Sequence, residues 1–226
     1  MSVPVVAIDG PSGVGKGTIA RAAARKLGWH FLDSGSLYRI LALAAQKAGI
    51  SDRDEAAVAA LAPKLNIKFD VQDYDNEHIT VDGEELSARV RAEASGQLAS
   101  VIAVYPKVRA ALLERQRAFR QKPGLVADGR DMGTVVFPDA AVKIFLDASA
   151  EERARRRLNQ LRKAGIAAKL AALHAEIRER DVRDRNRQHS PLKPADDAVV
   201  IDTTELTVQE VLARVEELLK ARGYAR

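Results

Sequence analysis

The feature that most constrains this chain is a glycine-rich loop between an apolar run and a helix-forming run. Residues 3–8 are apolar and rich in Val, which is typical of a buried parallel strand. The loop after them has the pattern of a phosphate-binding loop in the strand–loop–helix context that this motif requires. Its residues are Gly10, Pro11, Ser12, Gly13, Val14, Gly15, Lys16, Gly17 and Thr18.

The chemistry of this loop predicts a bound nucleoside triphosphate. Glycines let the backbone curl so that several N–H groups point inward, and the following helix adds the positive end of its dipole. Lys16 is expected to reach the β- and γ-phosphates of ATP. A glycine-rich turn with an incidental lysine is the alternative, but strand, glycines, lysine and helix are all in register.

One position departs from the usual phosphate-loop pattern. The residue after Lys16 is Gly17, where Ser or Thr ordinarily supplies a hydroxyl to Mg²⁺, and Thr18 follows. Thr18 is therefore expected to contact phosphate or water on the metal. The sequence predicts Mg²⁺ as the companion of ATP but assigns it no direct protein ligand.

The remainder of the chain alternates predicted strands and helices, which favours a three-layer α/β core with a parallel sheet covered on both faces. A Thr207–Glu210 capping box predicts the start of the terminal helix, and Ser51 is predicted to cap a helix that ends near Pro63. Strands are expected at 30–33, 125–127, 142–146 and 199–201, and helices at 17–27, 37–48, 88–104, 106–119 and 207–219.

Two segments interrupt this alternation within what the length of 226 residues suggests is one domain spanning 1–226. Apolar residues alternate with polar ones on both sides of residue 75, and Asp82-Gly83 follows, so a small antiparallel insertion is predicted at about 63–95. The segment at about 150–187 is helical and Arg-rich, with Gly165 as the expected break.

Charge and composition exclude several classes of protein. The net charge is +5, yet residues 151–187 alone carry twelve basic and six acidic residues, so the excess is local. Aromatic residues make up 4%, too few for a basic groove with interleaved stacking platforms, so no nucleic-acid partner is expected. There is no cysteine, no run of about 18 apolar residues and no basic leader at the N-terminus, so we expect a cytoplasmic protein without a membrane partner.

Three polar segments follow predicted strands or close the Arg-rich region: Asp33-Ser34-Gly35, Gly129-Arg130-Asp131-Met132-Gly133-Thr134 and Arg183-Asp184-Arg185-Asn186-Arg187. In open parallel sheets, ligands bind beyond the carboxyl ends of the strands. Together with the Gly-Lys-Gly-Thr loop, these segments resemble the signatures of bacterial cytidylate kinases, which belong to the nucleoside monophosphate kinase family of phosphate-loop proteins. The resemblance covers nearly the whole chain.

The resemblance implies an activity and a division of the chain. It implies transfer of the γ-phosphoryl group of ATP to CMP, and to dCMP, giving ADP and CDP or dCDP. The transfer would be in line, without a covalent enzyme intermediate, in a protein expected to be a monomer. The insertion at about 63–95 would help hold the monophosphate, and the region at about 150–187 would form a mobile lid with one or two arginines on the ATP phosphates.

Roles for individual residues also come from the resemblance. Lys16, Arg130 and Arg187 would neutralise charge during transfer. Ser34, Arg39, Arg130 and Arg187 would hold the acceptor phosphate, and Arg180 and Asp184 would bind its ribose. The cytosine ring would be read by Ser100, Arg109 and Asp131, because a carboxylate suits its amino group while hydroxyl and guanidinium donors suit its ring nitrogen and carbonyl.

Each of these residues also has a simpler interpretation. Arg180 and Asp184 are four apart and could form an exposed helix pair, and Ser100 could be a helix-surface serine. Asp33 could cap the next helix, and Arg153 with Arg155, Arg156 and Arg157 could form a solvated helix face. Two alternative functions also stay open: a phosphate-loop kinase for another nucleoside monophosphate or dephospho-coenzyme A, and a nucleic-acid-binding phosphate-loop ATPase.

Overall fold

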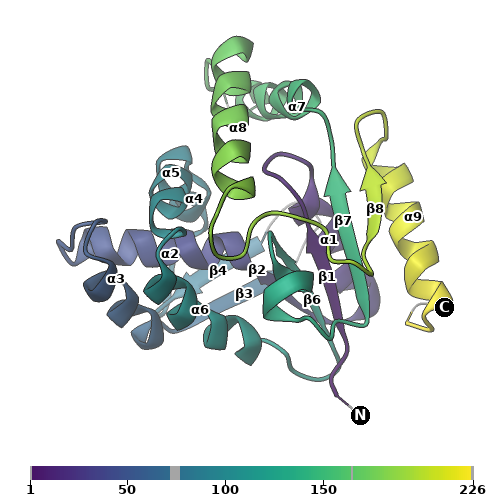
Figure 1. Cartoon of the computed structure of the whole chain (residues 1–226), viewed down its shortest axis with the longest axis horizontal. Helices are drawn as coiled ribbons and strands as arrows, with labels where there is room; N and C mark the ends of the chain where they lie inside the picture. The colour runs from purple at the N-terminus through teal and green to yellow at the C-terminus, as the bar shows by residue number, and fades with distance from the viewer. Residues whose placement is uncertain (1, 72–76, 164, 225–226) are drawn as a thin grey trace. The chain divides into compact units, whose positions relative to one another are not determined.

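A parallel sheet forms the centre of the fold, as the sequence predicts. The computed structural model describes residues 2–71, 77–163 and 165–224 (Figure 1). Its five-stranded sheet has the order β2-β6-β1-β7-β8. The strands are β1 (Val5–Asp9), β2 (His30–Asp33), β6 (Leu125–Gly129), β7 (Val142–Asp147) and β8 (Val199–Asp202). Every residue of β1 and β6 is buried, because both faces of a parallel sheet are covered.

The other elements follow the predicted alternation. A second, three-stranded sheet has the order β3-β4-β5, with β3 (Ile67–Val71), β4 (Glu77–Val81) and β5 (Glu84–Glu85). The helices are α1 (Lys16–Leu27), α2 (Ser34–Lys47), α3 (Glu55–Leu61), α4 (Ser87–Arg91), α5 (Glu93–Ile102), α6 (Pro106–Ala118), α7 (Ala150–Lys163), α8 (Leu170–Arg185) and α9 (Val208–Ala221), with a 3₁₀ turn η1 (Ala62–Lys64) and a π-helical turn η2 (Met132–Val136).

The chain divides into two compact units. Unit 1 comprises residues 1–5 and 20–128, and unit 2 comprises residues 6–19 and 129–226. In unit 1, β2 pairs in parallel with β6, α2 packs against α5, and α3 packs against α6. Its fully buried side chains include Leu37, Leu41, Val58, Ile102 and Leu112.

The small antiparallel sheet of unit 1 confirms the predicted strands of the insertion. β3 and β4 pair so that Phe69 lies opposite Ile79. The turn between β4 and β5 is Asp82-Gly83, and both residues have positive φ, 52° and 87°. This is the backbone conformation that a two-residue type I′ turn needs. Residues 72–76 of the predicted insertion lie outside the described part of the chain, and its role in holding a monophosphate stays a prediction.

Unit 2 contains the Arg-rich segment as a pair of helices. Within this unit β1 and β8 both pair in parallel with β7. Helices α7 and α8 lie side by side (Figure 1) and share an apolar cluster of Ala154, Leu158, Leu173 and Ile177. Gly165 has φ 73° and its N–H bonds to the carbonyl of Arg162, which confirms the predicted break.

Two predicted helix boundaries are wrong. Ser51 does not cap α3; the cap is Asp54, whose carboxylate accepts the N–H of Ala57 at 3.0 Å. The predicted helix at 88–104 is two helices, because Ala92 has an extended ψ of 145° that ends α4 and begins α5. None of the helices in the described ranges is both long and apolar enough to cross a lipid bilayer.

The capping box of α9 generates a test of the fold. The Thr207 hydroxyl accepts the N–H of Glu210 at 3.3 Å, and the Glu210 carboxylate accepts the N–H of Thr207 at 2.8 Å. Replacing an N-cap Thr by Ala costs about 0.5–2 kcal/mol. We expect Thr207→Ala to lower the free energy of unfolding in urea by about 1 kcal/mol. Thr207→Ser keeps the hydroxyl and should match the parent; equal losses in both variants would contradict the cap.

Candidate active site

The phosphate-binding loop is packed tightly against two elements of unit 2. Gly10 has φ 151°, and a Cβ there would lie 2.1 Å from the carbonyl oxygen of Leu146 in β7. Gly13 has φ 80°, and a Cβ there would lie 3.3 Å from Cβ of Arg153 in α7. Both positions therefore require glycine. Lys16 begins α1, is 6% exposed and donates from Nζ to the carbonyl of Pro11 at 2.9 Å.

Asp9, the last residue of β1, joins this loop to the segment after β6. Its two carboxylate oxygens accept the N–H groups of Met132 and Gly133, each at 2.8 Å. Burial raises the pKa of Asp9 to about 7, although these two hydrogen bonds and the charge of Lys16 act in the opposite direction. Asp9 is not among the predicted site residues, although a carboxylate at a strand end directly before the loop is visible in the sequence.

Asp184 in α8 is the centre of a cluster of three arginines. Its carboxylate accepts Nε of Arg130 at 3.2 Å and also binds the guanidinium of Arg187. Burial by itself would raise the pKa of Asp184, but the charges of Arg130, Arg187 and Arg180 outweigh it and hold the pKa below its ordinary value. Asp184 is only 1% exposed, so its interpretation as an exposed helix pair with Arg180 is wrong. Three cations around one carboxylate give a net positive cluster suited to an anion.

The Arg-rich start of α7 is not a solvated face throughout. Arg155 is exposed and pairs with Glu152, as expected for such a face. Arg153, by contrast, is 2% exposed and donates to the carbonyl of Ser12 at 3.0 Å, while Arg156 donates to that of Val14 at 3.2 Å. Two arginines of the predicted lid therefore bind the backbone of the phosphate loop.

In unit 1, two predicted phosphate ligands are held at the start of α2. The Ser34 hydroxyl donates to Oε1 of Gln116 at 2.7 Å. Arg39 donates to the carbonyls of Val90 and Ala92 at 2.9 and 3.3 Å. Asp33 caps α2 by accepting the N–H of Ser36 at 3.0 Å, which confirms the simpler interpretation of that residue.

Gly96 makes room for one of these ligands. A Cβ at Gly96 in α5 would lie 2.9 Å from a terminal nitrogen of Arg39. Neither Gly96 nor Gln116 is among the predicted site residues. A glycine inside a helix costs about 1 kcal/mol relative to alanine, which was a readable signal for Gly96. Nothing in the sequence distinguishes Gln116 from a surface glutamine.

The predicted base-reading residues lie in both units. Arg109 in α6 is 5.9 Å from the ring centre of Tyr38 and donates to the carbonyl of Ala103 at 3.3 Å. Ser100 is buried in α5, which contradicts its interpretation as a helix-surface serine, and Asp131 is buried in unit 2. Unit 1 thus holds Ser34, Arg39, Ser100 and Arg109, and unit 2 holds the loop 10–18 with Arg130, Asp131, Arg180, Asp184 and Arg187.

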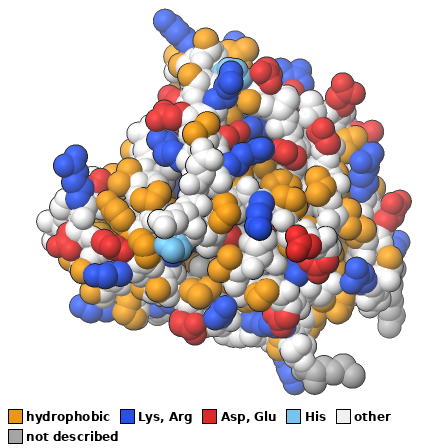
Figure 2. All heavy atoms as spheres, viewed as in Figure 1, with side chains coloured by type: hydrophobic (Ala, Val, Ile, Leu, Met, Phe, Trp, Pro, Cys, Tyr) orange, Lys and Arg blue, Asp and Glu red, His pale blue; other side chains and the backbone are white. Residues whose placement is uncertain are grey.

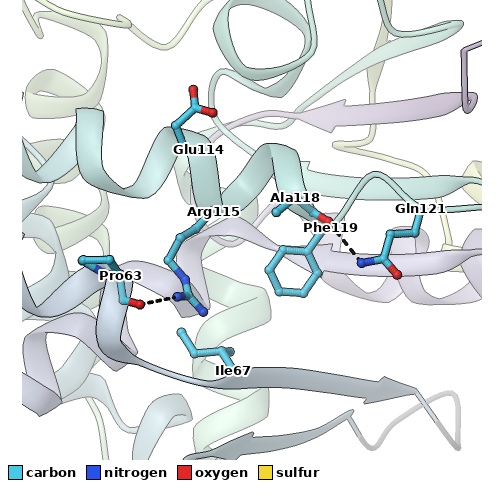
Figure 3. A pocket seen from close by; sticks show the side chains of 7 residues that line it. All are labelled: Pro63, Ile67, Glu114, Arg115, Ala118, Phe119 and Gln121. Carbon is cyan, nitrogen blue, oxygen red and sulfur yellow. Dashed lines mark hydrogen bonds between the residues drawn. The ribbon is translucent and has the colours of Figure 1, made fainter.

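An open pocket lies elsewhere in unit 1 (Figure 3). In it Arg115 donates to the carbonyl of Pro63 at 3.4 Å, and Gln121 donates to that of Ala118 at 3.3 Å. The remaining lining residues are Ile67, Glu114 and Phe119, so no predicted site residue borders it. This pocket is not the candidate active site.

The distribution of charged side chains and of possible metal ligands also characterises the protein. On the face drawn in Figure 2, Lys and Arg side chains are interspersed with Asp and Glu. Over the described ranges, no group of three or more His, Asp or Glu side chains is placed to hold a metal ion. Mg²⁺ that accompanies a nucleotide is commonly held by the nucleotide's phosphates, water and one or two carboxylates, and it needs no such group of side chains.

Comparison with known proteins identifies the family. The family model described as cytidylate kinase matches residues 6–221. The chain is 58% identical over 212 residues to a cytidylate kinase of Aeromonas salmonicida, covering 94% of this chain and 92% of that protein. It is 52% identical to one of Enterobacter sp., covering 100% of this chain and 96% of that protein. A solved uncharacterized protein from Eubacterium ventriosum shares the fold at a TM-score of 0.52 and 10% identity, covering 97% and 99% of the two chains.

The buried Asp184 cluster predicts a stability change that depends on pH. Removing one member of a buried ion pair costs about 3–5 kcal/mol. We therefore expect Asp184→Asn to lower the free energy of unfolding by about 3 kcal/mol at pH 7. Because the folded pKa of Asp184 is depressed, the parent keeps this stabilisation above the ordinary carboxyl value and loses it as pH falls through the folded pKa.

Urea unfolding of parent and Asp184→Asn at several pH values from 7 down to about 3 measures this gap, which should shrink at the acid end. Glu179→Gln is the matched control, because Glu179 forms an exposed pair with Arg183 on the same helix. It should change stability by less than about 0.5 kcal/mol. A gap for Asp184→Asn that does not depend on pH would contradict the assigned charge interaction.

Proposed function

The chain belongs to the cytidylate kinase family, and on this premise we propose that it transfers the γ-phosphoryl group of ATP to CMP, and to dCMP. The products are ADP and CDP or dCDP. The observation that carries the proposal is the match of the cytidylate kinase family model over residues 6–221, together with relatives more than 50% identical over nearly the whole chain. A cytoplasmic monomer is part of the same proposal.

On the donor side, residues 10–18 bind the triphosphate of ATP. The glycine-dependent backbone of this loop supplies N–H donors, and the N-terminus of α1 faces the same loop. Lys16 exchanges its bond to the Pro11 carbonyl for a phosphate oxygen and neutralises charge on the migrating group. Mg²⁺ bound to the nucleotide would add to this neutralisation, and the Thr18 hydroxyl, two residues after Lys16, would contact a phosphate or water on the metal.

On the acceptor side, Arg130 and Arg187 bind the phosphate of CMP. Asp184 holds both guanidiniums and keeps them oriented before the substrate arrives. A carboxylate has about four acceptor positions, so Asp184 can also accept a ribose hydroxyl, with Arg180 beside it. Ser34 and Arg39, which belong to unit 1, are the further phosphate ligands in this proposal. In-line attack by a CMP phosphate oxygen then needs only positioning and charge neutralisation by these groups.

Selection of the base depends on pairing each hydrogen-bond donor of the base with an acceptor of the site, and each acceptor with a donor. Asp131 accepts a hydrogen bond from the amino group of cytosine, and Arg109 and Ser100 donate to its ring nitrogen and carbonyl. UMP would place a carbonyl against the carboxylate and a ring N–H against a donor. A site whose buried polar groups are left unpaired can reject a ligand by about 10⁴-fold.

A substrate panel tests the proposed function. Coupled ADP release is measured with CMP, dCMP, UMP, AMP, GMP and dephospho-coenzyme A, and ATP hydrolysis is measured with and without single-stranded nucleic acid. We expect CMP and dCMP to be the best acceptors and nucleic acid to have no effect. Lys16→Met is the control and should stay folded with very low transfer activity. Preference for another acceptor, or stimulation by nucleic acid, would overturn the proposal.

The adjacent residues Arg130 and Asp131 are predicted to differ in their effect on selectivity. We expect Asp131→Ala to lower kcat/KM for CMP by about 100-fold, because it removes a base-specific contact worth roughly 1–3 kcal/mol. Its effect on UMP should be much smaller. Arg130→Ala should lower kcat/KM for CMP and UMP alike, because both share the phosphate. The test measures kcat/KM for CMP and for UMP with both variants. If Asp131→Ala affects both acceptors equally while Arg130→Ala changes their ratio, the two roles are exchanged.

A further inference from the structure

The guanidinium of Arg153 is fully engaged inside unit 2 (Figure 1 shows its helix, α7). Its Nε donates to the carbonyl of Ala148 at 3.0 Å, and one terminal nitrogen donates to the carbonyl of Ser12 at 3.0 Å. Both terminal nitrogens bind the carboxylate of Asp181 in α8, one of them at 3.0 Å. A side chain that is 3% exposed and satisfied in this way is built into the structure, not held out for solvent or a phosphate.

The bond to Ser12 has a directional consequence for the phosphate loop. A trans peptide unit is planar, so its C=O and the N–H of the next residue point in opposite directions. Arg153 draws the Ser12 carbonyl toward α7 and thereby fixes the direction of the Gly13 N–H. Arg156 acts in the same way on the Val14 carbonyl and the Gly15 N–H. Gly13 and Gly15 have little conformational preference of their own. The hydrogen bonds from the two arginines therefore have their greatest effect on the backbone direction at these positions.

The bond to Asp181 connects the same guanidinium to the acceptor side. Asp181 lies three residues before Asp184 on α8, so the two carboxylates are neighbours on one helix face. Asp181 binds Arg153, which holds the phosphate loop, and Asp184 binds Arg130 and Arg187. Charge-assisted bonds thus run from the Ser12 carbonyl to Asp181 and from Asp184 to the two arginines, and one turn of α8 joins the two carboxylates.

We propose that Arg153 is a positioning residue: it orients the N–H donors of the phosphate loop for ATP and, through Asp181, links that loop to the arginines of the acceptor phosphate. The second half of this statement rests on the proposed function. Because such linkage is reciprocal, CMP should tighten ATP binding by the factor by which ATP tightens CMP binding. Arg153 itself touches neither phosphate.

The test measures the Kd of a non-hydrolysable ATP analogue by calorimetry, with and without saturating CMP. We expect Arg153→Met to weaken analogue binding about tenfold in the absence of CMP, because the loop loses a charge-assisted anchor. In the parent, we expect the Kd of the analogue without CMP to be about tenfold or more above the Kd with CMP. Asp181→Asn should leave the Kd without CMP within about threefold of the parent. It should bring the ratio of the two Kd values close to one. Arg155→Met, at an exposed position of the same helix, is the matched control and should behave as the parent.

The outcomes separate this inference from the proposed function. The inference is overturned if Arg153→Met binds the analogue with a Kd within about threefold of the parent. It is also overturned if Asp181→Asn keeps the parent's ratio of the Kd values without and with CMP. Urea unfolding verifies that each variant is folded; where Arg153→Met is not, Arg153→Lys, which keeps the charge but loses the fork of donors, replaces it with the same expected weakening. If the parent does not bind CMP, the proposed function fails, and the arm without CMP still decides the role of Arg153 in the loop.

Discussion

Much of unit 2 depends on the two hydrogen bonds that the Asp9 carboxylate accepts from Met132 and Gly133. Asp9 ends β1, and the next residue, Gly10, begins the phosphate loop by packing against the backbone of β7. A carboxylate this deeply buried is costly unless both oxygens are satisfied. The backbone that satisfies them starts the π-helical turn η2, immediately after Arg130 and Asp131. The proposed donor loop and the proposed acceptor residues are therefore joined through one side chain.

The same device recurs along the sheet. Each of its five strands carries an aspartate as its last residue or, in β6, as its next-to-last residue, namely Asp9, Asp33, Asp128, Asp147 and Asp202. Asp33 accepts the N–H of Ser36, Asp147 that of Ala148 and Asp202 that of Thr204, at 2.8 to 3.0 Å. These bonds fix how the chain leaves β2, β7 and β8. Loops that carry binding residues gain accuracy when the strand end holds them in this way.

The parts of the fold that depend on local sequence could be predicted. The phosphate loop, the buried strands, the break at Gly165 and the Thr207–Glu210 cap all depend on residues close together in the chain. The α3 cap was wrong because Ser51, Asp52 and Asp54 can all cap a helix, and only the position of the first helical turn selects Asp54. The choice among such neighbours is made by packing, which propensity does not encode.

The candidate site was predictable in its residue types but not in its internal contacts. Arg153 and Arg156 are three apart, so the sequence places them on one helix face, yet it does not say whether that face meets solvent or the carbonyls of residues 12 and 14. Asp184 likewise reads as a helix-surface residue until Arg130, 54 positions earlier, is brought to it. Contacts between distant segments decide these roles, and no local pattern records them.

The charge of the Asp184 cluster has a consequence for encounter with an anion. Arg130, Arg180 and Arg187 act on a single carboxylate, so the cluster keeps a net positive charge after its internal pairing. Such a field extends over about one Debye length, roughly 8 Å at physiological ionic strength. A dianionic phosphate would be drawn toward such a cluster while still in solution, and added salt would slow its capture more than it would weaken contacts made once it is bound.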